Sequence, residues 1–116
     1  MTNELNRKYD AAVLQEIDGD RQGAIESLRQ MIAQTPDFAL AYTALSAMYN
    51  RAGKPEQAVE YAKRYTELEP EDSFGFTVLS SLCIKAGRRE EAEDALMNAQ
   101  QIQMRAYMTP QEKNQE

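Results

Sequence analysis

The residues that could do chemistry in this sequence are few, and their types limit the reactions that they could support. Histidine, the commonest general base and a common metal ligand, is absent from all 116 residues. Cys83 is the one cysteine, so the chain can neither close an intramolecular disulfide nor form a thiolate zinc cluster. The sequence contains no glycine-rich phosphate loop, and its carboxylates lie in stretches that are typical of solvated helix faces. We therefore expect a protein that is not an enzyme and that needs neither a metal nor a cofactor.

Charge and hydropathy restrict the kind of partner. The formal net charge of −6 opposes non-specific binding to nucleic acid and to anionic lipid. No stretch approaches the roughly 18 apolar residues that a membrane helix requires, and the opening MTNELNRKYD lacks the apolar core of a signal peptide. A single cysteine suits a reducing compartment. We expect a cytoplasmic protein without membrane insertion and without nucleic-acid binding.

Several residue types recur along the chain with one common period. Three sets repeat every 34 residues: glycine at 19, 53 and 87, alanine at 24, 58 and 92, and proline at 36 and 70, where Met104 takes the third place. Glycine ends a helix in a left-handed conformation, alanine lets two helices cross closely, and proline separates one hairpin from the next. Apolar residues recur between them at helical spacing. The period predicts an all-α chain of three helical hairpins.

The hairpins resemble the tetratricopeptide repeat. The second carries the pattern with Tyr42, Leu45-Ser46, Tyr49, Ala58, Ala62 and Pro70. The third carries it with Phe76, Leu79-Ser80, Cys83, Ala92, Leu96 and Met104. The first is more polar in its opening helix and then continues with Gly19, Ala24, Leu28 and Pro36. The resemblance implies an α-α superhelix (solenoid) with repeats over residues 5–38, 39–72 and 73–106.

The same register sets the expected boundaries. Helices are expected at residues 3–17, 20–34, 37–51, 54–68, 71–85 and 88–106. They make up one domain, residues 1–106, and the polar tail 107–116 is expected to be frayed. At the position that Tyr49 takes in the second repeat, Cys83 is expected to be a packed, unreactive thiol.

The resemblance also implies where a protein or peptide partner binds, because the first helix of each hairpin lines a concave groove in this family. The matching positions here are Tyr9, Val13, Leu40, Thr43, Ala44, Ala47, Asn50, Phe74, Thr77, Val78 and Ser81. Packing against neighbouring helices is the alternative for Val13 and Val78, as it is for Ile17 and Ile84 in the same helices. The best candidates for contact are Tyr9, Leu40, Thr43, Phe74 and Thr77.

The best-known ligand of the family, the carboxylate tail of heat-shock chaperones, does not suit this groove. The family holds that carboxylate with lysine, asparagine and arginine, and the matching positions here are Tyr9, Val13, Ala44, Phe74 and Val78. None carries a cation or an amide, so a carboxylate would lose its water without gaining a charged partner. We therefore expect an adaptor or scaffold whose groove binds an apolar or amphipathic segment.

A structural subunit that self-associates is the alternative function. Many proteins of this family end with an extra helix over the last hairpin, and no such helix is evident here. Ala95, Ala99 and Ile102 of the final helix are therefore a possible association surface for a homo-oligomer. In the competing interpretation these residues pack on the preceding helix of their own hairpin, and glutamines keep the outer face in water.

Overall fold

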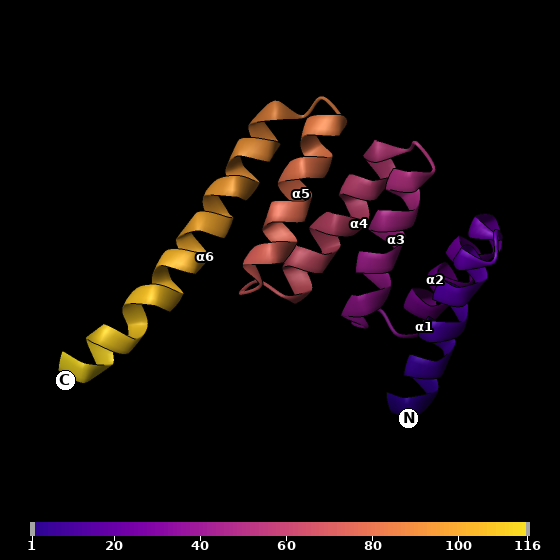
Figure 1. Cartoon of the computed structure of the whole chain (residues 1–116), viewed down its shortest axis with the longest axis horizontal. Helices are drawn as coiled ribbons and strands as arrows, with labels where there is room; N and C mark the ends of the chain where they lie inside the picture. The colour runs from indigo at the N-terminus through magenta and orange to yellow at the C-terminus, as the bar shows by residue number, and fades with distance from the viewer. Residues whose placement is uncertain (1, 116) are drawn as a thin grey trace.

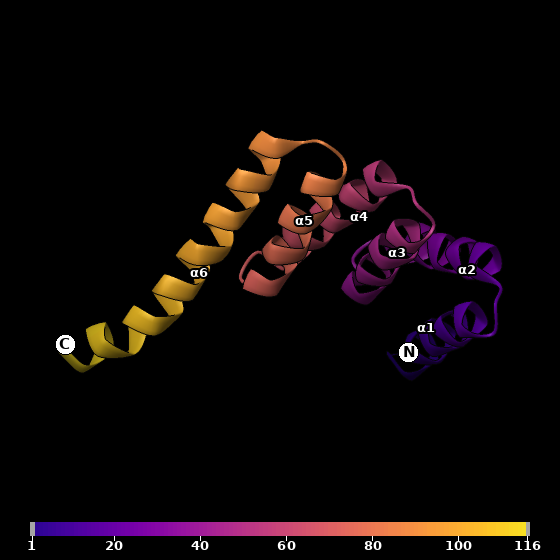
Figure 2. The same ribbon diagram turned by 45° about the horizontal axis from the view of Figure 1, so that its top comes forward.

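The computed structural model describes residues 2–115, with side chains from residue 4 to residue 108. The described residues form six helices and no strand: α1 (Thr2–Ile17), α2 (Arg21–Gln34), α3 (Ala39–Arg51), α4 (Pro55–Leu68), α5 (Ser73–Lys85) and α6 (Arg89–Gln115). They pair in chain order into three antiparallel hairpins that lie side by side (Figure 1). A second view shows the hairpins following one another along the long axis, with α6 extending past the others (Figure 2). The predicted all-α solenoid is confirmed.

Glycine closes each hairpin by adopting a backbone conformation that other residues resist. Gly19, Gly53 and Gly87 have φ angles of 105°, 75° and 75°. In the second turn the backbone N–H of Lys54 then donates to the carbonyl of Tyr49 at 2.9 Å, which satisfies a helix-end acceptor. A Cβ added at any of the three glycines would meet no atom within 4 Å. The requirement for glycine is therefore set by the backbone and not by space.

Small residues let the two helices of each hairpin cross closely, as the alanine spacing predicts. Ala24, Ala58 and Ala92 are 0%, 0% and 2% exposed. In the third hairpin the hydroxyl of Ser80 also donates to the backbone carbonyl of Ala92 at 2.7 Å, so a side chain on α5 binds the backbone of α6. A larger side chain at these positions would push the helices apart.

The apolar core is shared between consecutive hairpins. One buried cluster joins Leu28 of α2 to Met48 of α3, and a second joins Val59 of α4 to Leu82 of α5. Cys83 lies in the second cluster and is fully buried, as expected for a packed thiol. Each hairpin is thus stabilised by its neighbour, which is the rule for repeat proteins.

Five of the six helices begin one or two residues later than the sequence predicts, and aspartate side chains cap two of these five. The Asp20 carboxylate accepts from the backbone N–H of Gly23 at 2.9 Å, and Asp72 accepts from that of Phe74 at 3.0 Å. These caps satisfy donors that the first turn of a helix leaves without a partner.

The prediction for the end of the last helix is wrong. We expected it to end near residue 106 and a frayed tail to follow, but α6 continues to Gln115. Residues 97–109 contain neither glycine nor proline, so no strong helix-breaking residue lies near the expected boundary at 106 before Pro110. The expected boundary at 106 thus falls inside a helix; of the expected tail, residue 116 lies outside the described residues.

Candidate functional site

Exposed side chains on α3 and α5 repeat with the period of the hairpins. Leu40 and Phe74 occupy equivalent places, 34 residues apart, and are 48% and 69% exposed. Thr43 and Thr77 follow one helical turn later and are also exposed, as is Ser81. Residues three and four apart lie on one face of a helix, so α3 and α5 present matching faces with a large apolar residue followed by a threonine.

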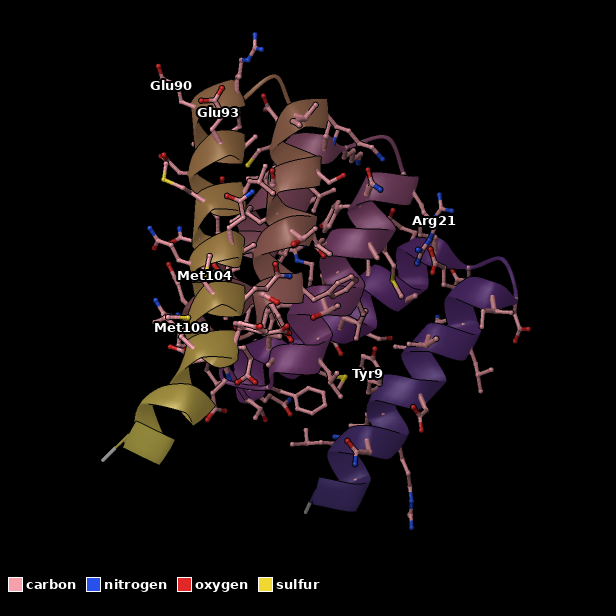
Figure 3. All side chains as sticks on the ribbon, turned by 60° about the vertical axis from the view of Figure 1, so that its left-hand side comes forward. Tyr9, Arg21, Glu90, Glu93, Met104 and Met108 are labelled. Carbon is pink, nitrogen blue, oxygen red and sulfur yellow. The ribbon has the colours of Figure 1, made fainter. Side chains whose placement is uncertain are left out.

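On α1 the corresponding face carries an aromatic residue that already has an intramolecular partner. Tyr9 lies edge-on to Phe38, with ring centroids 6.1 Å apart, and is half-buried on the side of α1 toward the second hairpin (Figure 3). This burial raises the pKa of the Tyr9 hydroxyl, so it stays protonated and can donate a hydrogen bond. Val13, one turn further on, is half-buried as well.

Besides Tyr9 and Val13, four more of the expected groove residues are buried or half-buried. Ala44 is 8% exposed and belongs to the core shared with α2, so it cannot form the floor of a binding groove. Ala47, one turn further along α3, is half-buried. Val78, which takes the place of Ala44 in α5, is half-buried as well. Asn50 is half-buried too, and its side-chain oxygen accepts from the Lys85 ammonium at 3.3 Å. The periodicity identified the correct helices but not how deeply each position packs.

A narrow crevice of about 40 Å³ lies beside Phe74, where α3, α4 and α5 meet. It is lined by Thr43, Ser46, Ala62, Tyr65, Phe74, Gly75 and Val78. Helices α4 and α5 approach closely here because α5 has a glycine where it meets Tyr65 of α4: a Cβ at Gly75 would lie 2.7 Å from the ring. The Tyr65 hydroxyl donates to Asp72, and this hydrogen bond raises the pKa of Tyr65 to about 12. The tyrosine and its carboxylate partner thus fix the position of α5 and, with it, Phe74.

Ion pairs tie neighbouring helices together at the turns. The Arg51 guanidinium donates to the Glu16 carboxylate at 3.0 Å, and Arg21 donates to it at 2.9 Å. The hydrogen bond from Arg51 lowers the pKa of Glu16, and Arg21 adds to the effect. Just before the last helix, Arg88 donates to Glu91 and also lies 3.1 Å from Glu60 of α4.

The last helix differs from the prediction in which face it exposes. Ala95, Ala99 and Ile102 are 3%, 2% and 8% exposed, so the proposed association surface is wrong, and the competing interpretation is correct. These residues recur at spacings of four and three, so they lie on one face of α6, and α6 packs on α5. The apolar residues that α6 leaves exposed are Leu96, Met97, Met104, Tyr107 and Met108. Met104 and Met108 point away from the neighbouring helices (Figure 3).

A larger cavity, of about 450 Å³, opens at the C-terminal end of the solenoid between α5 and α6. It is lined by Ser80, Ile84, Gly87, Arg89, Ala92, Glu93 and Leu96. We did not predict this surface from the sequence, although the repeat register contains a signal for it. Ile25 and Val59 are followed at the third equivalent position by Glu93, a switch from apolar to charged that is typical of an uncovered end.

The described part of the chain offers little for catalysis. Within it, no group of three or more cysteine, aspartate or glutamate side chains is arranged to hold a metal ion. Burial raises the pKa of the Cys83 thiol, which keeps it in the unreactive protonated form. No helix among the described residues combines the length and the apolar character needed to cross a bilayer.

The second hairpin decides the family. A sequence model described as tetratricopeptide repeat matches residues 39–72, which include α3 and α4. This hairpin is a tetratricopeptide repeat. A sequence search of curated proteins found no match.

Several solved structures have the same fold as this chain. The chain is similar to the MamA protein with a TM-score of 0.79 and 21% identity, over 87% of this chain and 55% of that one. It is similar to the type III secretion chaperone SycD of Yersinia enterocolitica, solved with a peptide of the translocator YopD, with a TM-score of 0.77 and 17% identity, over 88% and 78%. The second TPR of Spaghetti (RPAP3), bound to the HSP90 peptide SRMEEVD, gives a TM-score of 0.73 and 19% identity, over 84% and 91%. At these identities the likeness concerns the fold, and this chain spans only 55–60% of the length of two MamA structures.

Proposed function

We propose that this protein is an adaptor that binds an apolar or amphipathic peptide segment across the first helices of its hairpins. The observation that carries the proposal is the pair Leu40 and Phe74, two large apolar side chains exposed at equivalent positions of neighbouring repeats. A single exposed apolar side chain on a protein surface needs no explanation. Apolar side chains that repeat along the axis of the solenoid form a continuous surface, which suits an extended or helical partner. The bound peptides in the SycD and RPAP3 structures support this kind of function for the fold.

The exposed residues Leu40, Thr43, Phe74 and Thr77 form a row along α3 and α5. The chemistry of this row suits an apolar partner better than a charged one. Thr43 and Thr77 add hydroxyl groups beside the apolar pair, and Ser81 and Ala47 leave room for a partner side chain. The nearest cation on α3, Arg51, is already engaged by Glu16, and Lys85 on α5 is engaged by Asn50. A partner held here therefore places apolar side chains against Leu40 and Phe74, and each buried side chain contributes about 1.5–3 kcal/mol.

A library of peptides of varied sequence tests the proposal, because it does not require the natural partner. Peptides selected on the wild-type protein are measured by fluorescence anisotropy against L40E and F74E, with M97E as the matched control. Met97 is 54% exposed but lies on α6, away from the row. We expect L40E and F74E each to weaken peptide binding by roughly 10-fold or more, and M97E to leave it unchanged.

Circular dichroism of all three variants shows whether they keep the helical content of the wild type, since each substitution is at an exposed position. Selected peptides that bind L40E and F74E as tightly as they bind the wild type would show that the row is not the binding surface. Failure of the library to give any binder would count against the proposal as well.

A further inference from the structure

The two internal junctions between hairpins share one polar contact with a fixed offset. Glu16, near the end of α1, accepts from Arg51 at the end of α3. Asn50 accepts from Lys85 at 3.3 Å in the same way at the next junction. In both pairs the second residue lies 35 positions after the first, one repeat plus one residue. Each junction therefore joins the same two places of consecutive repeats.

A third pair of this kind would need a helix after α6, and α6 is the last helix of the described residues. The place of Glu16 and Asn50 is taken in the third repeat by Ile84, and the place of Arg51 and Lys85 is taken in the first repeat by Ile17. Ile84 is 67% exposed and Ile17 is 71% exposed. Where the internal junctions pair polar groups, the two ends of the solenoid thus each present an isoleucine.

A second pair of positions shows the same match. Met48 of α3 and Leu82 of α5 are buried against the preceding hairpin, and the equivalent residue of α1, Leu14, is 56% exposed. On the other side of the junction, Leu28 is fully buried, whereas its equivalent in α6, Leu96, is 45% exposed. Leu96 and Ile84 both line the open cavity of about 450 Å³.

Charge is complementary at the same place. Arg21, the first residue of α2, donates to the backbone carbonyl of Arg51 at the C-terminus of α3, at 3.3 Å. Arg89 is the equivalent first residue of α6; its side chain is 91% exposed and contacts Glu93 at 3.6 Å. If helix α1 of a second copy packed on α6 as α3 packs on α2, the C-terminus of α1, followed by Asp18, would lie near Arg89. Cations are favoured at helix C-termini.

We propose that the occupant of the open groove between α5 and α6 is helix α1 of a second copy, so that copies join head to tail and continue the superhelix. Ile17 of one copy then packs on Ile84 of the next, Leu14 packs near Leu96, and Arg89 caps the end of the incoming helix. The interface continues the one that α2 forms with α3 and α4 forms with α5. Because the two joining surfaces differ, the assembly is heterologous and open-ended.

The junction is weaker than the internal ones. Glu93 stands where the internal junction has the buried Val59, and α1 presents Asp10 where α3 presents the buried Ala44. Both carboxylates must stay at the rim in water, which reduces the apolar area that is buried. Assembly is therefore expected to depend on concentration and to remain reversible.

Sedimentation velocity on the full chain, from micromolar to millimolar concentration, tests the proposal with two variants, I17E and I84E. Each variant leaves one end intact and places a carboxylate at the other. In a solution of either variant, every head-to-tail junction includes a damaged end, so we expect self-association to weaken by roughly 10-fold or more.

An equimolar mixture of the two variants gives the decisive readout. The intact C-terminal end of I17E can join the intact N-terminal end of I84E, while the two damaged ends repel each other. The mixture should therefore form a discrete dimer with one copy of each variant, with wild-type affinity and no larger species. A symmetric interface between two like ends would instead be lost in only one of the variants and would not be restored on mixing.

L40E serves as the matched control, because Leu40 is exposed on α3 away from both ends and should not affect self-association. A wild-type protein that stays monomeric at every concentration would overturn the proposal, and so would variants that associate as the wild type does. The proposal does not rest on the peptide-binding function, because I17E and I84E should bind selected peptides normally and L40E should not.

Discussion

The groove between α3 and α4 and the groove between α5 and α6 occupy equivalent places in consecutive repeats, yet only the first is covered. Helix α5 covers it, and Val59 and Ala62 are 0% and 3% exposed there. At the open groove Glu93 and Leu96 take the same repeat positions, and Leu96 is 45% exposed. The local backbone is alike in both hairpins. A following helix, and not the hairpin itself, therefore decides whether a repeat position belongs to the core or to the surface.

The largest expected effect comes from exchanging the residue type between the two grooves. V59E places a carboxylate without a cation in the covered groove, and we expect it to lower the free energy of unfolding by roughly 3–5 kcal/mol. E93V makes the reverse change in the open groove and should alter it by less than about 0.5 kcal/mol. Urea denaturation followed by circular dichroism measures both. Equal effects for the two variants would mean that the grooves do not differ as described.

A second comparison tests apolar burial at one repeat position. Leu28 is fully buried and its equivalent Leu96 is 45% exposed. L28A should lower the free energy of unfolding by about 2–5 kcal/mol, because it leaves a cavity in the core. L96A removes the same atoms from a partly exposed site and should cost about 1 kcal/mol or less. Denaturation below the concentration at which the wild type self-associates gives both values, and a loss for L96A as large as for L28A would contradict the comparison.

The smallest expected effect concerns acid. The hydrogen bond from Arg88, helped by Lys63, lowers the pKa of Glu91 from 4.5 to about 2. Since the folded pKa is below the unfolded one, the carboxylate stabilises the fold above pH 4.5, and this contribution is lost as the pH falls toward 2. The melting temperature of E91Q should thus fall less steeply with acid than that of the wild type.

The matched control for this titration is E90Q, which removes a neighbouring carboxylate and keeps the pair of Arg88 with Glu91. Its melting temperature should follow the wild-type curve through the same pH range. Identical acid profiles for all three proteins would show that the ion pair does not contribute to stability.

Much of the fold could be predicted from the sequence, because its requirements are local. The left-handed turns at Gly19, Gly53 and Gly87 and the close crossings at the three alanines depend on residue type within a few positions of the chain. The candidate site was predicted less well. The exposed Leu40 and Phe74 were found from the register, but Ala44, assigned to the same surface, is part of the core. The repeat register predicts on which face of a helix a residue lies. How deeply that residue is buried depends on the packing of the neighbouring hairpin.

What the sequence determined by itself is a series of hairpins, since a period of 34 residues with glycine and alanine in phase permits few other structures. What only the tertiary structure decided is the exposure of equivalent residues. Ala95, Ala99 and Ile102 turn inward onto α5, Leu96 turns outward, and α6 runs on past residue 106. The physical reason is that burial is a property of two packed elements, and a helix at the end of a solenoid has a neighbour on one side only.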